Sequence, residues 1–223
     1  HKNKITFGFD ERSDVFATWQ EHGKETRISA VVFGRAIELI IPMLGRYRVE
    51  SCLAILAILS ALKIEPDILV GWAANLDIPE GRGRRHQING ITLIDDSYNA
   101  NPVSMTDAIE GLSAVKPGRA IALLGEMLEL GEHSHDAHEA VGRACKLVDT
   151  VWTIGTGFLD VAASARTHHH LNDVSDFDLK LFAKNLVPGD VVLIKGSNKV
   201  FWQKGFVEKL RSLNEEDDAE FAD

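Results

Sequence analysis

From about residue 83 onward, short apolar runs alternate with longer segments in which apolar residues recur at helical spacing. The apolar runs predict strands at residues 91–95, 120–124, 151–154, 171–174 and 191–195. The helical segments are residues 103–115, 135–147, 158–166, 177–186 and 201–213. Strands joined by such helices form right-handed β-α-β units in a parallel sheet that helices cover on both faces. We therefore expect an α/β domain with a mostly parallel, Rossmann-like sheet over residues 81–213.

The first 80 residues have a different pattern. Strands are expected at residues 5–9, 15–20, 27–33 and 36–41, and short turns at residues 21–24 and 34–35 join the later ones. Strands with such short connections pair antiparallel, because a parallel crossover needs about a dozen residues. A helix with apolar positions between Val49 and Leu62 and a shorter helix after Glu65 follow. We expect this segment to be part of a larger domain, joined to the next by a linker at residues 77–85.

Charge and cysteine content exclude several classes of protein. The chain has 223 residues, with 24 Lys and Arg against 33 Asp and Glu, and six of these acids fall in residues 214–223. The remaining body is close to neutral, which gives no electrostatic footprint for nucleic acid or an anionic membrane. Cys52 and Cys145 lie in apolar helical patterns, which excludes a disulfide framework and is typical of a cytoplasmic protein. No apolar run reaches the length of a membrane span, and residues 214–223 are expected to be a disordered tail.

Polar turns follow four of the predicted strands. They are residues 95–102 (Asp-Asp-Ser-Tyr-Asn-Ala-Asn-Pro), 125–131, 155–157 and 195–198. Because the carboxyl ends of parallel strands meet at one edge of a sheet, we expect these turns to converge on a ligand site.

Several of these residues also have a structural interpretation. Asn101 before Pro102 is a ready helix cap, and Asp95 and Asp96 could end a strand as well as bind a ribose or a cation. Lys195 at the end of a buried strand is harder to explain structurally, because burying a lone ammonium is costly.

Histidines and arginines give weaker signals. Residues 168–170, three consecutive histidines, are expected to be a solvated loop rather than a metal tract. His133, His135 and His138 have no nearby cysteine, so a zinc site is not expected there, although His138 faces the polar edge and could position a ligand. The arginines of residues 81–85 could grip phosphate.

Three longer strings resemble the Mur ligases. They are residues 95–105 (Asp-Asp-Ser-Tyr-Asn-Ala-Asn-Pro-Val-Ser-Met), residues 124–131 (Leu-Gly-Glu-Met-Leu-Glu-Leu-Gly) with His138, and residues 188–197 (Pro-Gly-Asp-Val-Val-Leu-Ile-Lys-Gly-Ser). Gly45-Arg46 and residues 81–85 stand in the order that the family shows. Within this family, the resemblance is to the members that add D-alanyl-D-alanine to UDP-N-acetylmuramoyl-tripeptide.

The resemblance implies a cytoplasmic, monomeric enzyme of three domains for peptidoglycan precursor synthesis. Residues 1–80 would be the end of its central ATPase domain, and residues 81–213 its Rossmann-like ligase domain. The sugar-binding domain, the phosphate-binding loop and the Mg²⁺ ligands would lie outside this chain, so the chain alone is expected to be inactive. The whole enzyme would use ATP to make an acyl phosphate, which the amine of the dipeptide then attacks.

The resemblance also implies roles for individual residues. Arg85 would reach the nucleotide phosphates, and Asp96, or Asp95 as second choice, would hold the ATP ribose. Lys195 would be a catalytic residue that contacts the dipeptide or the sugar-peptide. The remaining expected contacts are Tyr98 and Asn99 to the nucleotide and Asn101, Glu126, His138 and Ser197 to the substrate.

Two other functions remain open. Another amide ligase of the superfamily, similar to folylpolyglutamate synthase, is one, and a non-catalytic Rossmann-like binding module is the other. The Asn-Ala-Asn-Pro string of residues 99–102 argues against the former. Tyr47, Arg48 and Ser51 stand where the family usually has His, Asn and Asn near the adenine, which leaves the contacts of that segment open.

Overall fold

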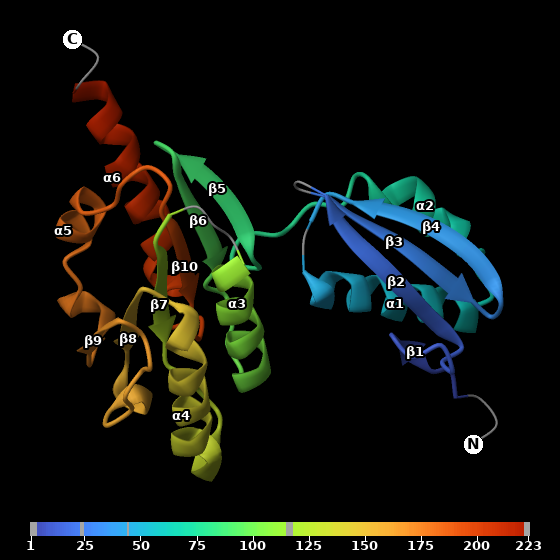
Figure 1. Cartoon of the computed structure of the whole chain (residues 1–223), viewed down its shortest axis with the longest axis horizontal. Helices are drawn as coiled ribbons and strands as arrows, with labels where there is room; N and C mark the ends of the chain where they lie inside the picture. The colour runs from blue at the N-terminus through green and yellow to red at the C-terminus, as the bar shows by residue number, and fades with distance from the viewer. Residues whose placement is uncertain (1–3, 23–24, 44, 115–117, 221–223) are drawn as a thin grey trace. The chain divides into compact units, whose positions relative to one another are not determined.

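The computed structural model describes residues 4–22, 25–43, 45–114 and 118–220, and the chain divides into two compact units, residues 1–78 and 79–223 (Figure 1). The first unit is a four-stranded sheet with two helices. Its sheet order is β1 (Phe7–Gly8), β2 (Val15–His22), β3 (Glu25–Val32) and β4 (Arg35–Ile41), and α1 (Arg46–Ala61) and α2 (Asp67–Ala73) follow.

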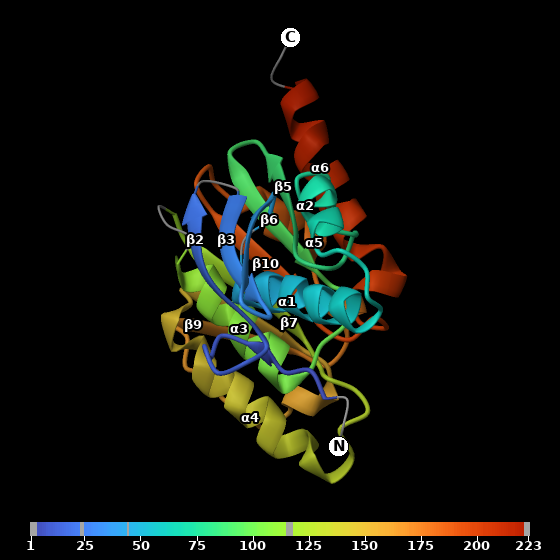
Figure 2. The ribbon, with the colours of Figure 1, turned by 90° about the vertical axis from the view of Figure 1, so that its right-hand side faces the viewer.

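Strands β2, β3 and β4 pair antiparallel, as their short connections predict. Alternate side chains such as Ile28 and Leu39 are buried together with Leu53 and Leu56 of α1, which crosses this sheet (Figure 2). Two residues of the expected turn at 21–24 lie outside the described residues.

The strand expected at residues 5–9 is shorter than predicted. Only Phe7–Gly8 is extended in the sheet, and it pairs parallel, not antiparallel, with β2. The Asp14 carboxylate explains this arrangement, because it accepts hydrogen bonds of 2.8 Å from the backbone N–H and the hydroxyl of Thr6. These bonds hold the start of β1 beside the start of β2, so the two strands run in the same direction.

The second unit is a six-stranded α/β layer. Its strand order is β5 (Arg84–Ile88), β6 (Ile91–Asp96), β10 (Val191–Lys195), β7 (Ala120–Gly125), β8 (Thr150–Ile154) and β9 (Thr167–Leu171). Neighbouring strands pair parallel except β5, which is antiparallel to β6. The mostly parallel, Rossmann-like α/β fold that the alternating pattern predicts is confirmed.

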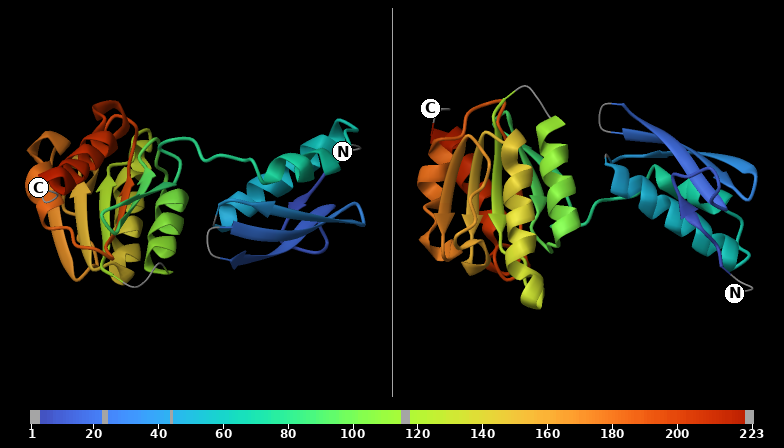
Figure 3. Two further views of the ribbon diagram at one scale, coloured as in Figure 1. Left: turned by 90° about the horizontal axis from the view of Figure 1, so that it is seen from above. Right: turned by 60° about the horizontal axis from the view of Figure 1, so that its bottom comes forward.

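Helices cover both faces of this sheet. They are α3 (Pro102–Ala114) and α4 (Ser134–Ala144) on one face, and α5 (Leu179–Lys184) and α6 (Phe206–Glu220) on the other (Figure 3). On the first face, Met105 and Val141 pack with Leu193, whereas on the second Leu210 packs with Ile194. Val115, the last residue of the first predicted helix, lies outside the described residues.

Several local expectations are wrong, among them the strand expected at residues 171–174, because β9 covers Thr167–Leu171. Arg84 and Arg85, expected in the linker, belong to β5, and residues 168–170, expected in a loop, belong to β9. The helix expected at residues 158–166 is a single 3₁₀ turn, Thr156–Phe158, because Leu159 takes an extended ψ of 133° and Asp160 a left-handed φ of 64°. Helix α6 continues to Glu220, so the segment expected to be disordered is helical up to that residue. Its Glu and Ala residues propagate a helix that is already nucleated.

Both cysteines are free and buried, as their apolar patterns predict. Burial raises the pKa of the Cys145 thiol to about 12. The thiolate is therefore scarcely populated at neutral pH, which makes this cysteine a packing residue.

Candidate functional site

The carboxyl ends of the parallel strands form a polar rim, which comprises residues 96–101, 125–131, 155–157 and 195–198. The backbone ties these turns together: Ser197 N–H donates to the Glu126 carbonyl at 3.1 Å, and Glu126 N–H donates to the Ile154 carbonyl at 2.8 Å. Gly125 and Gly196 permit the contact between β7 and β10, because a Cβ on Gly196 would lie 2.7 Å from the Gly125 Cα. The polar turns therefore do converge on one edge.

At the centre of the rim, Lys195 is paired with Asp96. Its Nζ donates to the Asp96 Oδ2 at 2.7 Å and to the Asn99 carbonyl at 3.1 Å. The Lys195 side chain is 3 % exposed and the Asp96 side chain 21 % exposed. The pair neutralises the buried ammonium and leaves part of the Asp96 carboxylate open to a ligand. Lys195 thus holds Asp96 in place rather than projecting into the open space of the rim.

Asp95 faces the other side of the sheet and is fully buried. Its Oδ1 accepts from the Ser97 hydroxyl at 2.5 Å and from the Ser97 N–H at 3.2 Å, and its Oδ2 accepts from the Gly81 N–H at 2.8 Å. Both oxygens are therefore engaged within the protein. Of the two carboxylates, Asp96 is the one that a ribose can reach.

Tyr98 is at the centre of an aromatic and cationic stack on the rim. The Arg82 guanidinium lies 4.1 Å from the centre of the Tyr98 ring, and the Trp202 ring lies edge-on to it at 5.6 Å. The Tyr98 side chain remains 37 % exposed. This cation–π contact holds the Arg82 guanidinium over the Tyr98 ring beside the rim.

The expected phosphate arginine, Arg85, is placed differently. It is exposed in β5 opposite Ile94, on the same face of the sheet as Asp96 but one position farther from the strand end than Arg84. The sequence alone does not distinguish Arg82 from the other arginines of residues 81–85. The glycines on either side were the signal, since both Gly81 and Gly83 take positive φ and let the backbone turn at this point.

The two asparagines of the Asp96 loop have separate positions. Asn99 is exposed and supplies its carbonyl to Lys195. Asn101 caps α3, because its Oδ1 accepts from the Ser104 N–H at 2.8 Å. The capping interpretation of Asn101 is the one that the geometry supports.

Glu126, His138 and Ser197 connect the rim turns to one another. Glu126 Oε2 accepts from the Gly157 N–H at 2.8 Å, and the Ser197 hydroxyl accepts from the Leu128 N–H at 2.9 Å. His138 is fully buried, where its Nε2 accepts from the Met127 N–H at 2.9 Å.

The second ring nitrogen of His138, Nδ1, lies 2.7 Å from the Ser134 carbonyl, so the neutral ring carries its proton there. Burial lowers the pKa of His138 and favours this neutral form. Both ring nitrogens of His138 are therefore engaged inside the protein, where they join the 125–131 turn to the start of α4.

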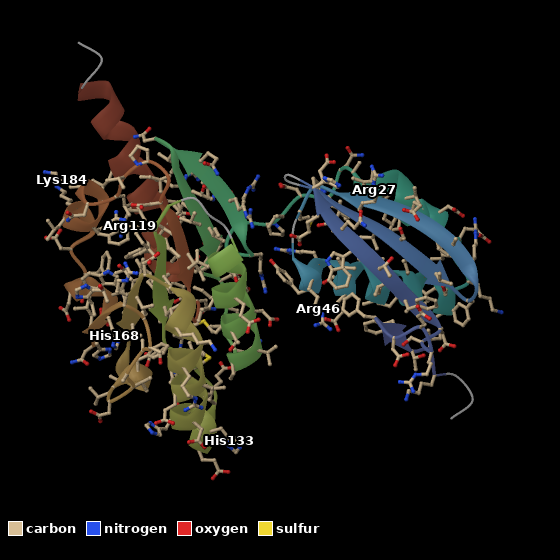
Figure 4. All side chains as sticks on the ribbon, in the orientation of Figure 1. Arg27, Arg46, Arg119, His133, His168 and Lys184 are labelled. Carbon is tan, nitrogen blue, oxygen red and sulfur yellow. The ribbon has the colours of Figure 1, made fainter. Side chains whose placement is uncertain are left out.

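A cavity of about 220 Å³ lies elsewhere in the second unit, between α5 and the sheet. Trp152, His169, Phe177 and Phe182 line it together with Arg119, and none of the rim residues does. Figure 4 shows Arg119 and His133 at opposite ends of the sheet, and the rim lies at the His133 end. Arg119 is occupied there by an ion pair with Asp190.

In the first unit, residues 45–51 form the start of α1, where Arg46, Tyr47 and Ser51 are exposed. Arg46 lies over the Phe9 ring at 4.7 Å and Arg48 over the Tyr47 ring at 4.5 Å. The Ser51 hydroxyl donates to the Tyr47 carbonyl at 2.9 Å. The Tyr47 side chain is 44 % exposed, so a planar ring could approach it from solvent.

The second unit therefore belongs to the class of doubly wound α/β domains, and its polar rim carries the oriented carboxylate of Asp96 beside the stacked Arg82 and Tyr98. A family model described as Mur ligase, glutamate ligase domain, matches residues 81–198, more than half of the chain. The chain belongs to the Mur ligase family, as the three sequence strings predicted.

Individual relatives agree with this assignment. The UDP-N-acetylmuramoyl-tripeptide–D-alanyl-D-alanine ligase of Escherichia coli is 28% identical over 81% of this chain and 40% of its own length. The Mycobacterium tuberculosis protein of the same name is 34% identical over 72% of this chain and 37% of its own length. This chain therefore spans about two fifths of the length of these curated relatives.

Solved structures give the same picture of the fold. The MurF ligase from Thermotoga maritima, in a complex with ADP, aligns with a TM-score of 0.80 and 25% identity over 96% of this chain and 49% of that one. MurF from Acinetobacter baumannii aligns with a TM-score of 0.80 and 24% identity over 93% of this chain and 46% of that one. Among the residues that the structure describes, every helix is too short or too polar to cross a membrane.

Proposed function

We propose that the complete protein is an ATP-dependent amide ligase that joins D-alanyl-D-alanine to UDP-N-acetylmuramoyl-tripeptide, and that this chain supplies its C-terminal domain. The observation that carries the proposal is Asp96, a partly exposed carboxylate held by buried Lys195 on the rim of a domain matched by the Mur ligase model. The curated relatives with this activity in their names support the choice of substrates.

The chemistry explains why such a rim is useful. A carboxylate is a poor electrophile, and transfer of the ATP γ-phosphoryl group turns it into an acyl phosphate with a good leaving group. Attack by the dipeptide amine then gives the amide, ADP and phosphate. The domain has to position the amine and keep water from the acyl phosphate, which is a task of orientation and exclusion.

Individual rim residues fit separate parts of this task. Asp96 accepts hydrogen bonds from the ribose hydroxyls of ATP, while Arg82 neutralises phosphate charge from its position over Tyr98. Arg85 is the second candidate for that charge, because it shares a face of the sheet with Asp96. Asn99 is exposed beside Asp96 and can orient the nucleotide.

ATP as the nucleotide is supported by the ADP complex of the Thermotoga maritima ligase. The charge on its phosphates needs Mg²⁺ as well. On the rim, the Asp96 and Glu126 carboxylates are engaged by Lys195 and Gly157. We therefore place the magnesium ligands in parts of the full protein beyond these rim residues.

In this proposal residues 1–78 form the end of the central ATPase domain and residues 79–213 form the ligase domain. The enzyme is monomeric and acts in the cytoplasm, where its nucleotide substrates are made. Size-exclusion chromatography with light scattering checks the first statement, and fractionation of cells that express a tagged protein checks the second.

The function itself is tested with full-length protein, UDP-N-acetylmuramoyl-tripeptide and ATP, by measuring ADP release and amide product. Release that depends on D-alanyl-D-alanine supports the proposal. Release that depends on L-glutamate and a folate instead would assign the protein to the folylpolyglutamate synthase-like alternative. Nucleotide binding by the full protein without any amide formation would favour a binding module and overturn the proposal.

A further inference from the structure

Glu80, His86 and Asp95 gather on the face of the sheet opposite to Asp96. One carboxylate oxygen from each acid and one imidazole nitrogen lie within 4.8 Å of one another. The three residues come from the segment before β5, from β5 and from β6, so the cluster joins three separate pieces of backbone. The nucleotide rim, as proposed above, uses the other face of β6 and leaves this cluster unexplained.

His86 is the residue that points to a ligand. Its side chain is 10 % exposed, and in the part of the chain that the structure describes its Nε2 is buried without a hydrogen bond. Such a nitrogen loses the hydrogen bond to water that it has in the unfolded chain, which costs free energy. A buried ring nitrogen directed at two carboxylates gains that free energy back if a cation sits between them.

The two carboxylates are already held in position from behind. Arg84 Nη1 lies 3.0 Å from the Glu80 Oε1, which leaves Oε2 on the side of His86 at 3.4 Å from its Nε2. The backbone N–H of Gly81 and the Ser97 hydroxyl hold the Asp95 carboxylate. Hydrogen bonds that orient ligating carboxylates in this way are a regular feature of metal sites.

The distances select a class of ion. Zinc binds nitrogen and oxygen ligands at about 2.0–2.2 Å, so tetrahedral neighbours stand roughly 3.4 Å apart. The His86 Nε2 and Glu80 Oε2 atoms already have this separation. All three ligand atoms lie within 4.8 Å of one another, so bringing them to this spacing takes a shift of roughly an ångström. The Glu80 side chain can make such a shift because it is 39 % exposed. One imidazole with two carboxylates favours a first-row transition ion over Mg²⁺ or Ca²⁺, which prefer all-oxygen sites.

We propose that Glu80, His86 and Asp95 bind one divalent first-row transition ion, such as Zn²⁺, with solvent completing its coordination. The ion fixes the segment before β5 to the first two strands of the sheet and holds Gly81 beneath the Arg82–Tyr98–Trp202 stack. The competing arrangement is a protonated His86 between two carboxylates with no metal. The two differ in whether the purified protein takes up an ion through His86.

Isothermal titration of the metal-stripped chain with ZnCl₂ tests the proposal. The matched variants are His86→Ala, Glu80→Gln as a half-exposed site that leaves the fold intact, and His133→Ala as an exposed histidine outside the cluster. We expect His86→Ala and Glu80→Gln to lose one equivalent of zinc that the wild type and His133→Ala bind. Arg84→Gln, which removes the group that orients Glu80, is expected to weaken this equivalent about tenfold.

A second readout is the visible absorption of bound Co²⁺, whose bands report a nitrogen- and oxygen-ligated site. We expect these bands in the wild type and their loss in His86→Ala and Glu80→Gln, with circular dichroism showing that each variant is folded. Equal zinc stoichiometry and equal Co²⁺ spectra in the wild type, His86→Ala and Glu80→Gln would overturn the proposal and leave the protonated-histidine arrangement. Neither measurement involves ligase activity, so this result is independent of the proposed function.

Discussion

Lys195 and Asp96 stand directly opposite each other at the ends of the parallel strands β10 and β6, joined by a 2.7 Å hydrogen bond between Nζ and Oδ2. The strand register puts the ammonium and the carboxylate on the same face, so the pair follows from the β-sheet itself. Its consequence is a carboxylate with a fixed orientation at a point where ligands of parallel sheets collect.

Replacing Lys195 by Met removes the charge but keeps most of the side-chain volume. The Asp96 carboxylate then lacks its partner, and we expect the local stability of β6 and β10 to fall by roughly 1–3 kcal/mol. Native-state hydrogen exchange of the amides in these strands measures the loss. Lys199→Met, at an exposed position four residues beyond Lys195 and outside β10, is the control. Equal exchange in the two variants would show that the pair contributes nothing to the fold.

The two arginine candidates for phosphate can be separated by comparing matched variants of the full-length protein. Arg82→Ala removes the guanidinium that Tyr98 holds at the rim, so we expect kcat/KM for ATP to fall roughly 100-fold. Arg85→Ala removes an exposed side chain farther along β5, and we expect a smaller effect, within about tenfold. Steady-state ADP release at saturating dipeptide gives both values. The reverse order would assign the phosphate to Arg85.

Two histidines, the buried His138 and the half-buried His168, make the stability of the second unit sensitive to acid. Burial lowers the pKa of His138, and burial with the neighbouring His170 and His169 lowers the pKa of His168. Because the folded pKa lies below the unfolded one, the unfolded chain takes up protons first as the pH falls below about 6.5. The stabilisation is therefore complete above that pH and is lost on acidification.

Urea unfolding followed by circular dichroism at pH 7.5, 6.5 and 5.5 measures this dependence. His168→Gln is expected to unfold with a shallower pH dependence than the wild type, whereas the exposed His133→Gln should leave the dependence unchanged. A wild-type midpoint that does not move, or that rises toward pH 5.5, would contradict the assignment of neutral imidazoles to His138 and His168.

Much of the rim could be predicted from the sequence because the strands that support it are buried on both faces. β7 and β10 are buried at every position, so each appears as an uninterrupted apolar run that ends abruptly in polar residues. The edge strands lack this signal. β9 carries three histidines, and β5 reads Arg-Arg-His-Gln-Ile, since one side of each strand has no neighbouring strand to bury it.

The roles of single side chains were less predictable. Asp95 and Asp96 are adjacent and chemically identical, and only the alternation of side chains across β6 makes one fully buried and the other partly exposed. His138 lies near the rim in the sequence, but its ring packs edge-on against Phe158 at 4.6 Å and points inward. Contacts between segments that are distant in the sequence determine which of these side chains is buried, and local sequence patterns do not contain those contacts.

The KM for ATP of full-length Asp96→Asn tests most directly whether the rim completes the nucleotide site. The control is Asp107→Asn, which changes an exposed acid on α3. The asparagine keeps the shape of the side chain but weakens the hydrogen bonds to the ribose hydroxyls. A charged hydrogen bond is worth about 1.5–3 kcal/mol, so we expect the KM to rise roughly 10- to 100-fold in Asp96→Asn only. A KM for ATP equal to that of the wild type in folded Asp96→Asn would contradict the claim that this rim completes the nucleotide site.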